Sequence, residues 1–310
     1  MRILFWGTPA FAHTVLRGLL DAGREVVGVI TQPDRPAGRG RKTQPPPVKT
    51  AAERAGIAVF QPEKPRGEEF LGALRALEPD ISVVAAYGHI LRAEVLDLPP
   101  LGSFNVHASL LPELRGAAPV NWAIIRGYTE TGVTIMSMVE ELDAGPMILQ
   151  ASCPIPPDIT AGELTEQLAE LGSKTLLEAL ELIGVGRSVG EPQDPDAATY
   201  APKLKADDAR IDWTRPAVEV DRWIRGTDPT PGAWSELDGL RVRIFAPRVI
   251  VAAAEADPGV VVAADPRTGL EVATGLGSLG IGEVQPAGRR RMDTAEWIRG
   301  RGIALRRRFG

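Results

Sequence analysis

The stretch Arg2-Ile-Leu-Phe-Trp-Gly-Thr-Pro-Ala-Phe-Ala12 opens the chain with an apolar run, a turn and the start of a helical pattern. The residues up to Trp6 are suited to a buried β-strand, and Thr8 and Pro9 are typical of an N-cap and a first helical turn. Apolar residues at helical spacing follow, and Gly23 is suited to end the helix. A strand followed directly by a helix is the unit from which parallel sheets are built.

The same alternation of strand-like and helical segments continues through the first half of the chain. A capping box, Thr160-Ala-Gly-Glu163, predicts the start of another helix. Further strands are expected at 26–30, 57–60, 80–86, 103–106, 132–138 and 147–152, and a helix at 70–77. The pattern predicts an α/β domain with a Rossmann-like parallel sheet that is covered by helices on both faces.

The second half of the chain has a different composition. Residues 189–206 are rich in Gly, Pro, Asp and Ala, which is typical of a linker. One helical segment follows at about 216–226, and then short β-like runs at 241–245, 259–263, 270–273 and 278–285. We therefore expect a catalytic domain over 1–188, a linker over 189–206 and a small OB-like β-barrel over 207–310.

Composition limits the kinds of site that the chain can carry. Among its 310 residues Cys153 is the only cysteine, so an intrachain disulfide and a cysteine-based metal site are excluded. The three histidines are widely spaced, and we expect no metal. No run approaches the roughly 20 apolar residues of a membrane span, and the start of the chain does not resemble a signal peptide. We expect a cytoplasmic protein without membrane contact.

The charge of the chain is unevenly distributed. The net charge is −5, yet residues 33–49 hold five basic side chains and one acidic, a net charge of +4. Residues 289–310 hold eight arginines and two acidic side chains, a net charge of +6. Two basic patches on an acidic body favour contact with a polyanion at defined places, although a solubilising tail would have the same composition.

Polar side chains at the end of one expected strand are the main candidates for chemistry. Asn105 and His107 are two residues apart, so an extended backbone directs both to one side. A carboxamide and an imidazole on one side are suited to bind an oxygen that gains negative charge. Asp143, in a tight turn, is the best local candidate for a third group, although aspartates in turns are often backbone caps. His89 follows a buried strand and is a further residue that could line the pocket.

Several longer motifs carry a family resemblance. They are Gln32-Pro-Asp-Arg-Pro-Ala-Gly-Arg-Gly40, Asn105-Val-His-Ala-Ser-Leu-Leu-Pro112, Arg115-Gly-Ala-Ala-Pro119, Leu142-Asp-Ala-Gly145, Tyr200-Ala-Pro-Lys-Leu204 and Gln285-Pro-Ala-Gly-Arg-Arg-Arg-Met292. Together they resemble the methionyl-tRNA formyltransferase family over nearly the whole chain. The Asn-x-His and Ser-Leu-Leu-Pro motifs are shared with other enzymes that use formyltetrahydrofolate, whereas the basic insertion and the C-terminal motifs are more specific.

The resemblance implies transfer of the formyl group of 10-formyltetrahydrofolate to the free α-amine of methionyl initiator tRNA, for translation initiation. In that reaction Asn105 and His107 would stabilise the oxyanion, and Asp143 would orient and charge the imidazole. The resemblance implies folate binding by Ser109, Leu110, Leu111 and Pro112. It implies tRNA binding by Arg35, Arg39, Arg41, Lys42, Lys203, Arg289, Arg290 and Arg291. We further expect a monomer.

Three other functions remain open at this point. A formyltransferase that acts on a small or sugar-nucleotide amine would share the catalytic residues but would not need the basic insertion. A formyltetrahydrofolate hydrolase would not need a basic C-terminal domain. A non-catalytic RNA-binding protein would not need Asn105, His107 and Asp143 together.

Overall fold

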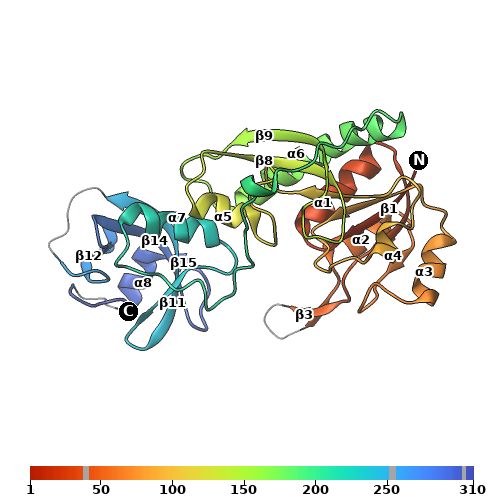
Figure 1. Ribbon diagram of the computed structural model, residues 1–310. Coiled ribbons are helices and arrows are strands. Elements are labelled where there is room, and N and C mark those ends of the chain that lie inside the picture. Colours follow the sequence, from red (N-terminus) through yellow and green to blue (C-terminus); the bar gives the residue numbers. More distant parts are fainter. Residues whose placement is uncertain (38–41, 251–255, 302–304) are drawn as a thin grey trace. The chain divides into compact units, whose positions relative to one another are not determined.

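The computed structural model describes residues 1–37, 42–250, 256–301 and 305–310, which form two compact units (Figure 1). The N-terminal unit comprises 1–119, 130–154 and 165–201, and the C-terminal unit comprises 120–129, 155–164 and 202–310. The domain boundaries expected at 188 and 207 stay a prediction.

A seven-stranded sheet with the order β5-β2-β1-β6-β7-β8-β9 forms the centre of the N-terminal unit. Its strands are β1 (Arg2–Gly7), β2 (Glu25–Ile30), β5 (Val59–Phe60), β6 (Ile81–Ala85), β7 (Ser103–His107), β8 (Glu130–Ser137) and β9 (Met147–Pro154). The first five strands in this order are parallel, whereas β8 and β9 are antiparallel to their neighbours. The chain crosses from one side of β1 to the other, and such a reversal leaves a crevice at the carboxyl ends of the strands. The expected Rossmann-like sheet is confirmed.

Both faces of this sheet are covered. All residues of β1 from Ile3 to Gly7 are buried, as expected for a parallel strand between two helical layers. Leu4 and Trp6 on one face pack with Leu74 and Tyr87. The helices with residues in this unit are α1 (Ala10–Asp21), α2 (Pro47–Arg54), α3 (Glu68–Arg75), α4 (Ala93–Leu96) and α6 (Ala161–Gly184), and a 3-10 turn, η1 (Pro195–Ala197), lies in its last segment.

The start of helix α1 differs from the sequence-based prediction. The N-cap residue is Pro9, which makes no side-chain cap bond, so Thr8 does not cap the helix. The hydroxyl of Thr8 donates to the carbonyl of Tyr87 at 3.2 Å and accepts from the amide of Gln32 at 3.3 Å. Thr8 thus connects the loops that follow β1, β2 and β6. Because its hydroxyl is bonded to Tyr87 and Gln32, it does not bond to the first amides of the helix. The capping box of α6 is confirmed, since Thr160 and Glu163 bond reciprocally.

The basic insertion begins with a two-stranded hairpin, β3 (Arg35–Ala37) and β4 (Lys42–Gln44). Arg39 and Arg41 lie outside the described residues, as does the side chain of Lys42. At the base of the hairpin Asp34 accepts bonds from Gln61 at 2.7 Å and from the Lys49 ammonium at 2.8 Å. These bonds, that from Gln61 first, lower the pKa of Asp34 below its ordinary value. Lys49 is therefore neutralised within the fold.

The C-terminal unit is built on an antiparallel sheet with the order β10-β11-β14-β13-β12. Its strands are β10 (Trp234–Leu237), β11 (Leu240–Ile250), β12 (Val261–Asp265), β13 (Gly269–Ala273) and β14 (Ser278–Pro286), with β15 (Met292–Asp293) paired to β14. The helices α5 (Pro119–Ile125), α7 (Ala217–Thr227) and α8 (Thr294–Arg301) complete the main elements. Among the described residues, no helix combines the length and apolar character needed to cross a membrane.

The last residues of the chain close this sheet. The amide of Val261 donates to the carbonyl of Arg307 at 2.7 Å, which joins the C-terminal segment to β12. On its other side Gly310 and Glu236 exchange backbone bonds of 2.9 and 3.0 Å, which join the same segment to β10. Phe309, only 1% exposed, points into the apolar core between these bonds. These bonds place the C-terminal segment between β10 and β12, the two ends of the described sheet, as expected for a small closed barrel.

Candidate active site

The structure brings the three candidate catalytic side chains together. Asn105 and His107 lie on β7, and Asp143 lies in the turn between β8 and β9. The Asn105 Nδ2 atom is 3.5 Å from Asp143 Oδ1, and His107 Nδ1 is 3.7 Å from Asp143 Oδ2. Asn105 and His107, two residues apart on an extended strand, therefore lie on the same side of β7, as the sequence predicted.

A backbone contact determines the tautomer of His107. Its Nε2 atom lies 3.0 Å from the carbonyl oxygen of Leu114. A carbonyl oxygen only accepts, so Nε2 must carry a proton and donate it. Nδ1, next to Asp143, is then the ring nitrogen that can gain or lose a proton. The imidazole is 6% exposed, so protein contacts rather than solvent orient it.

The Asp143 side chain is fixed by a residue distant in sequence. Its Oδ2 atom accepts a 2.8 Å bond from the amide of Gly116. Asp143 itself has a φ of 50°, in the left-handed region that non-glycine residues seldom adopt. A Cβ at Gly145 would overlap the carbonyl oxygen of Ser137, so only glycine allows this turn to pack on β8. The turn is an unusual backbone conformation that presents a carboxylate to His107.

The segment Ser109–Pro112 forms a rigid wall beside these residues. Ser109 and Leu111 are buried, while Leu110 and Pro112 are half-buried. The Thr134 hydroxyl donates to the carbonyl of Ser109 at 2.7 Å and accepts from the amide of Leu111 at 3.1 Å. Gln150 donates to the carbonyl of Leu111 at 2.9 Å. Because these backbone groups are already bonded within the protein, the segment offers shape more than free polar groups, and its folate role stays a prediction.

Two residues that were not predicted as site residues support the turn. Gln193 donates from Nε2 to the carbonyls of Asp143 and Gly145, at 2.8 and 2.7 Å. Its Oε1 atom accepts a 2.9 Å bond from the buried Arg115. Arg115 belongs to a motif that the sequence singled out, but Gln193 lies in the predicted linker, where no local pattern distinguishes it.

Exposed apolar side chains on neighbouring loops were also missed. Ile90 is 77% exposed and Leu142 is 54% exposed. A 3.3 Å bond from the amide of Ala93 to Glu140 connects the loops that carry them. Large exposed apolar groups beside a catalytic turn are typical of a surface that receives a ring system. His89, on the first of these loops, is exposed with its ring 5.6 Å from that of Tyr87.

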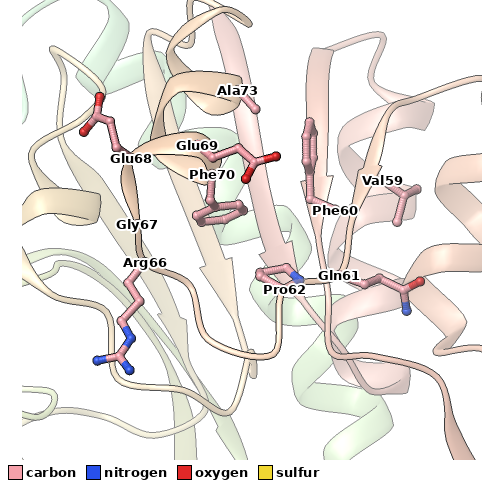
Figure 2. A pocket seen from close by; sticks show the side chains of 10 residues that line it. All are labelled: Val59, Phe60, Gln61, Pro62, Arg66, Gly67, Glu68, Glu69, Phe70 and Ala73. Carbon is pink, nitrogen blue, oxygen red and sulfur yellow. The ribbon is translucent and has the colours of Figure 1, made fainter.

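A separate cavity of about 600 Å³ lies between the end of β5 and the start of α3. Figure 2 shows its lining, in which the rings of Phe60 and Phe70 have centroids 6.5 Å apart. Arg66, Glu68 and Glu69 supply its charged groups. None of the residues that the sequence predicted for catalysis, folate or tRNA lines this cavity.

The predicted tRNA contacts differ in how free their charges are. Arg35, Lys203 and Arg289 are exposed. Arg290 bonds Glu296 at 2.6 Å. Arg291 bonds Asp228 at 2.9 Å and Glu283 at 2.6 Å. It also covers the ring of Phe245, with its guanidinium carbon 4.0 Å from the centroid. Arg291 is therefore engaged within the barrel, and its tRNA role is the least supported of the set. Among the described side chains no cluster of three His, Cys, Asp or Glu is arranged to hold a metal.

Comparison with known proteins gives the same assignment for both halves of the chain. Residues 1–180 match the family described as formyl transferase, and residues 203–302 match the formyl transferase C-terminal domain. A methionyl-tRNA formyltransferase of Desulfotalea psychrophila is 50% identical over 97% of this chain and 93% of its own. Another, of Geotalea uraniireducens, is 49% identical over 98% of this chain and 96% of its own.

A solved structure supports the fold independently. HypX from Aquifex aeolicus, in complex with tetrahydrofolic acid, matches 96% of this chain with a TM-score of 0.69 and 21% identity. This chain spans about half of that protein, since the match covers 47% of its length. At this identity the likeness concerns the fold alone. From the two family matches and the full-length relatives, the chain belongs to the methionyl-tRNA formyltransferase family.

Proposed function

We propose that this protein transfers the formyl group of 10-formyltetrahydrofolate to the α-amine of methionyl initiator tRNA. The observation that carries the proposal is the convergence of Asn105, His107 and Asp143 in a chain that is about half identical, over nearly its full length, to enzymes of that name. The basic hairpin favours tRNA over a small amine, because a small substrate needs no such insertion.

The reaction forms one C–N bond and breaks another. The neutral amine attacks the formyl carbon, and the formyl oxygen gains negative charge. The bond from that carbon to folate N10 then breaks, and the proton lost by the amine is the proton that N10 gains. An α-amine has an ordinary pKa of about 8, so a group that accepts its proton assists the attack near neutral pH.

The three side chains have distinct roles in this scheme. The Asn105 amide donates a hydrogen bond to the developing oxyanion. The Nε2–H of His107 donates a hydrogen bond to the Leu114 carbonyl, so Nδ1 is the ring nitrogen that faces the reacting groups. When Nδ1 is protonated, it is a second donor to the oxyanion, and the Asp143 carboxylate stabilises the imidazolium. Asp143 is also placed to receive the proton of the amine through a water molecule.

The donor contacts are proposed on two surfaces. Ser109–Pro112 supplies a rigid wall, and the exposed apolar side chains Ile90 and Leu142 pack against the rings of the donor. We place the action of the protein in the cytoplasm, where initiator tRNA is used, and we propose that it acts as a monomer. Arg35, Lys203 and Arg289 are the exposed cations proposed to contact tRNA phosphates.

An acceptor comparison tests this function. The purified protein is incubated with 10-formyltetrahydrofolate and methionyl initiator tRNA, methionyl elongator tRNA, an amino-sugar nucleotide or no acceptor. Formylation of the initiator alone is expected. Preferred transfer to the amino sugar, or release of formate without an acceptor, would contradict the proposal and support one of the alternative enzymes.

A further inference from the structure

We infer that Gln193 is a positioning residue that holds Asp143 in its catalytic conformation, an inference that rests on the function proposed above. The Gln193 side chain bonds the carbonyls of Asp143 and Gly145 in the turn and also the buried Arg115. It lies 50 residues beyond Asp143, in a segment that the sequence predicts to be only a linker.

Each polar atom of the Gln193 amide has a matching partner. The NH2 group has two protons, and it faces two carbonyl oxygens, those of Asp143 and Gly145. The Oε1 atom accepts from Arg115, so the orientation of the amide is fixed from both ends. A carboxylate of the same shape could keep the bond to Arg115, but it would place an oxygen against two carbonyl oxygens.

The turn needs such support because its backbone is strained at the catalytic residue. Asp143 has a positive φ, and the Gly116 amide fixes only its side chain. Gln193 is the contact that fixes the backbone carbonyl of Asp143 itself. Without it the turn can relax toward common dihedral angles, and the carboxylate then moves away from His107 Nδ1.

The segment that carries Gln193 is itself bonded to the catalytic loop. Glu191 and Met147 exchange backbone bonds of 2.8 Å at the start of β9. Further along, Thr199 accepts the Leu114 amide at its hydroxyl and the Arg115 amide at its carbonyl, at 2.9 and 2.8 Å. The Leu114 carbonyl also accepts the hydrogen bond from His107 Nε2. The same segment therefore holds the backbone that orients the histidine and the turn that carries the aspartate.

The test compares Gln193→Ala and Gln193→Glu with the wild type at pH 8. We expect kcat to fall by about 10- to 100-fold in both variants, as for displaced catalytic groups, with KM for donor and acceptor nearly unchanged. Thr175→Val is the matched control, because it removes a buried hydroxyl bond in the same unit, on helix α6, and should leave kcat unchanged. A Gln193→Glu variant with normal kcat would overturn the inference, since only packing would then matter.

A second readout does not depend on activity. With only three histidines in the chain, the ring nitrogen resonances of His107 can be assigned by its replacement. The Nδ1 resonance should shift in Gln193→Ala in the direction seen in Asp143→Asn, while it stays unchanged in Thr175→Val. An unchanged Nδ1 resonance in Gln193→Ala would overturn the inference. If instead the wild type fails to formylate any acceptor while the resonance shifts, the proposed function fails and the positioning role stands.

Discussion

At the scale of single residues, the site depends on which atom of each side chain is already bonded. His107 Nε2 is used by Leu114, and Asp143 Oδ2 is used by Gly116. The groups proposed for chemistry are His107 Nδ1, the Asp143 carboxylate and the Asn105 amide, whose Nδ2 atom lies 3.5 Å from Asp143 Oδ1. His107 Nδ1 is 3.7 Å from Asp143 Oδ2, which is longer than a hydrogen bond. We therefore expect the negative charge of the carboxylate to matter more than a hydrogen bond from it.

Replacement of Asp143 by asparagine tests that statement. The variant keeps the shape and the bond from Gly116 but removes the negative charge beside the imidazole. We expect kcat to fall by about 10²-fold or more, because one displaced or missing catalytic group has effects of this size, while the donor KM changes little. Single-turnover transfer to methionyl initiator tRNA measures the effect. Normal turnover would show that the charge has no role.

Neighbouring arginines on the barrel should behave differently. Arg291 is bonded to Asp228 and Glu283, so Arg291→Ala leaves the buried Asp228 without its counter-charge and should lower the melting temperature. Arg289 is exposed, so Arg289→Ala should keep the melting temperature and weaken tRNA binding. Thermal unfolding and tRNA titration of the two variants separate these effects. Equal behaviour of both would contradict the distinction.

At the scale of elements, the sequence predicted what depends on local spacing. The alternation at Asn105 and His107, the capping box at Thr160 and the alternation of strands with helices all follow from neighbours within a few residues. Thr8 fails as a predicted N-cap because partners at Gln32 and Tyr87 take its hydroxyl. Gln193 was missed for the same reason, since a contact across 50 residues leaves no local pattern.

Helix α7 contains a buried ion pair that gives an element-scale prediction. Arg225 bonds Asp221 at 2.6 Å and the Ile159 carbonyl at 3.0 Å, and both charged side chains are nearly buried. Burial raises the pKa of Asp221 above its ordinary value, while Arg225 acts in the opposite direction. Arg225→Met leaves an unpaired buried carboxylate and should reduce the free energy of unfolding by about 3–5 kcal/mol.

Urea unfolding at several pH values measures this loss. Because a protonated carboxyl needs no counter-charge, the loss should shrink as the pH falls through the pKa of Asp221, which burial raises and which Arg225 no longer lowers in the variant. The double variant Asp221→Leu with Arg225→Met is the control, and it should recover most of the stability. A single variant as stable as the wild type at neutral pH would contradict the account.

At the scale of the whole molecule, the groups proposed for catalysis lie in one unit, whereas the cations proposed for tRNA lie in both. The N-terminal unit holds the groups proposed for formyl transfer, and the barrel closes through the C-terminal segment at Phe309. The sequence did not predict how the barrel closes. Residues 305–310, which lie between β10 and β12, have the composition of a basic tail. We propose that the choice of acceptor depends on surface charge, which the local geometry at Asn105 and His107 does not determine.

The basic insertion gives a prediction for tRNA binding as a whole. Arg39 and Arg41 together should contact phosphates, so their replacement by alanine should weaken tRNA binding and reduce its salt dependence by roughly one unit of slope per lost contact. Arg75→Ala, which removes one exposed arginine that pairs with Glu68 on α3, is the control for loss of a surface cation outside the insertion and should leave both unchanged. Titrations at several salt concentrations measure the slope. An unchanged slope in the double variant would remove the insertion from the tRNA surface.

The rate of formyl transfer to methionyl initiator tRNA by His107→Ala, relative to the wild type, tests the central claim most directly. Three side chains acting as one unit predict a loss of about 10²–10³-fold or more in the single-turnover rate. The variant should stay folded, as judged by its melting temperature, and should still bind tRNA. A folded His107→Ala protein that formylates initiator tRNA at nearly the wild-type rate would contradict the account.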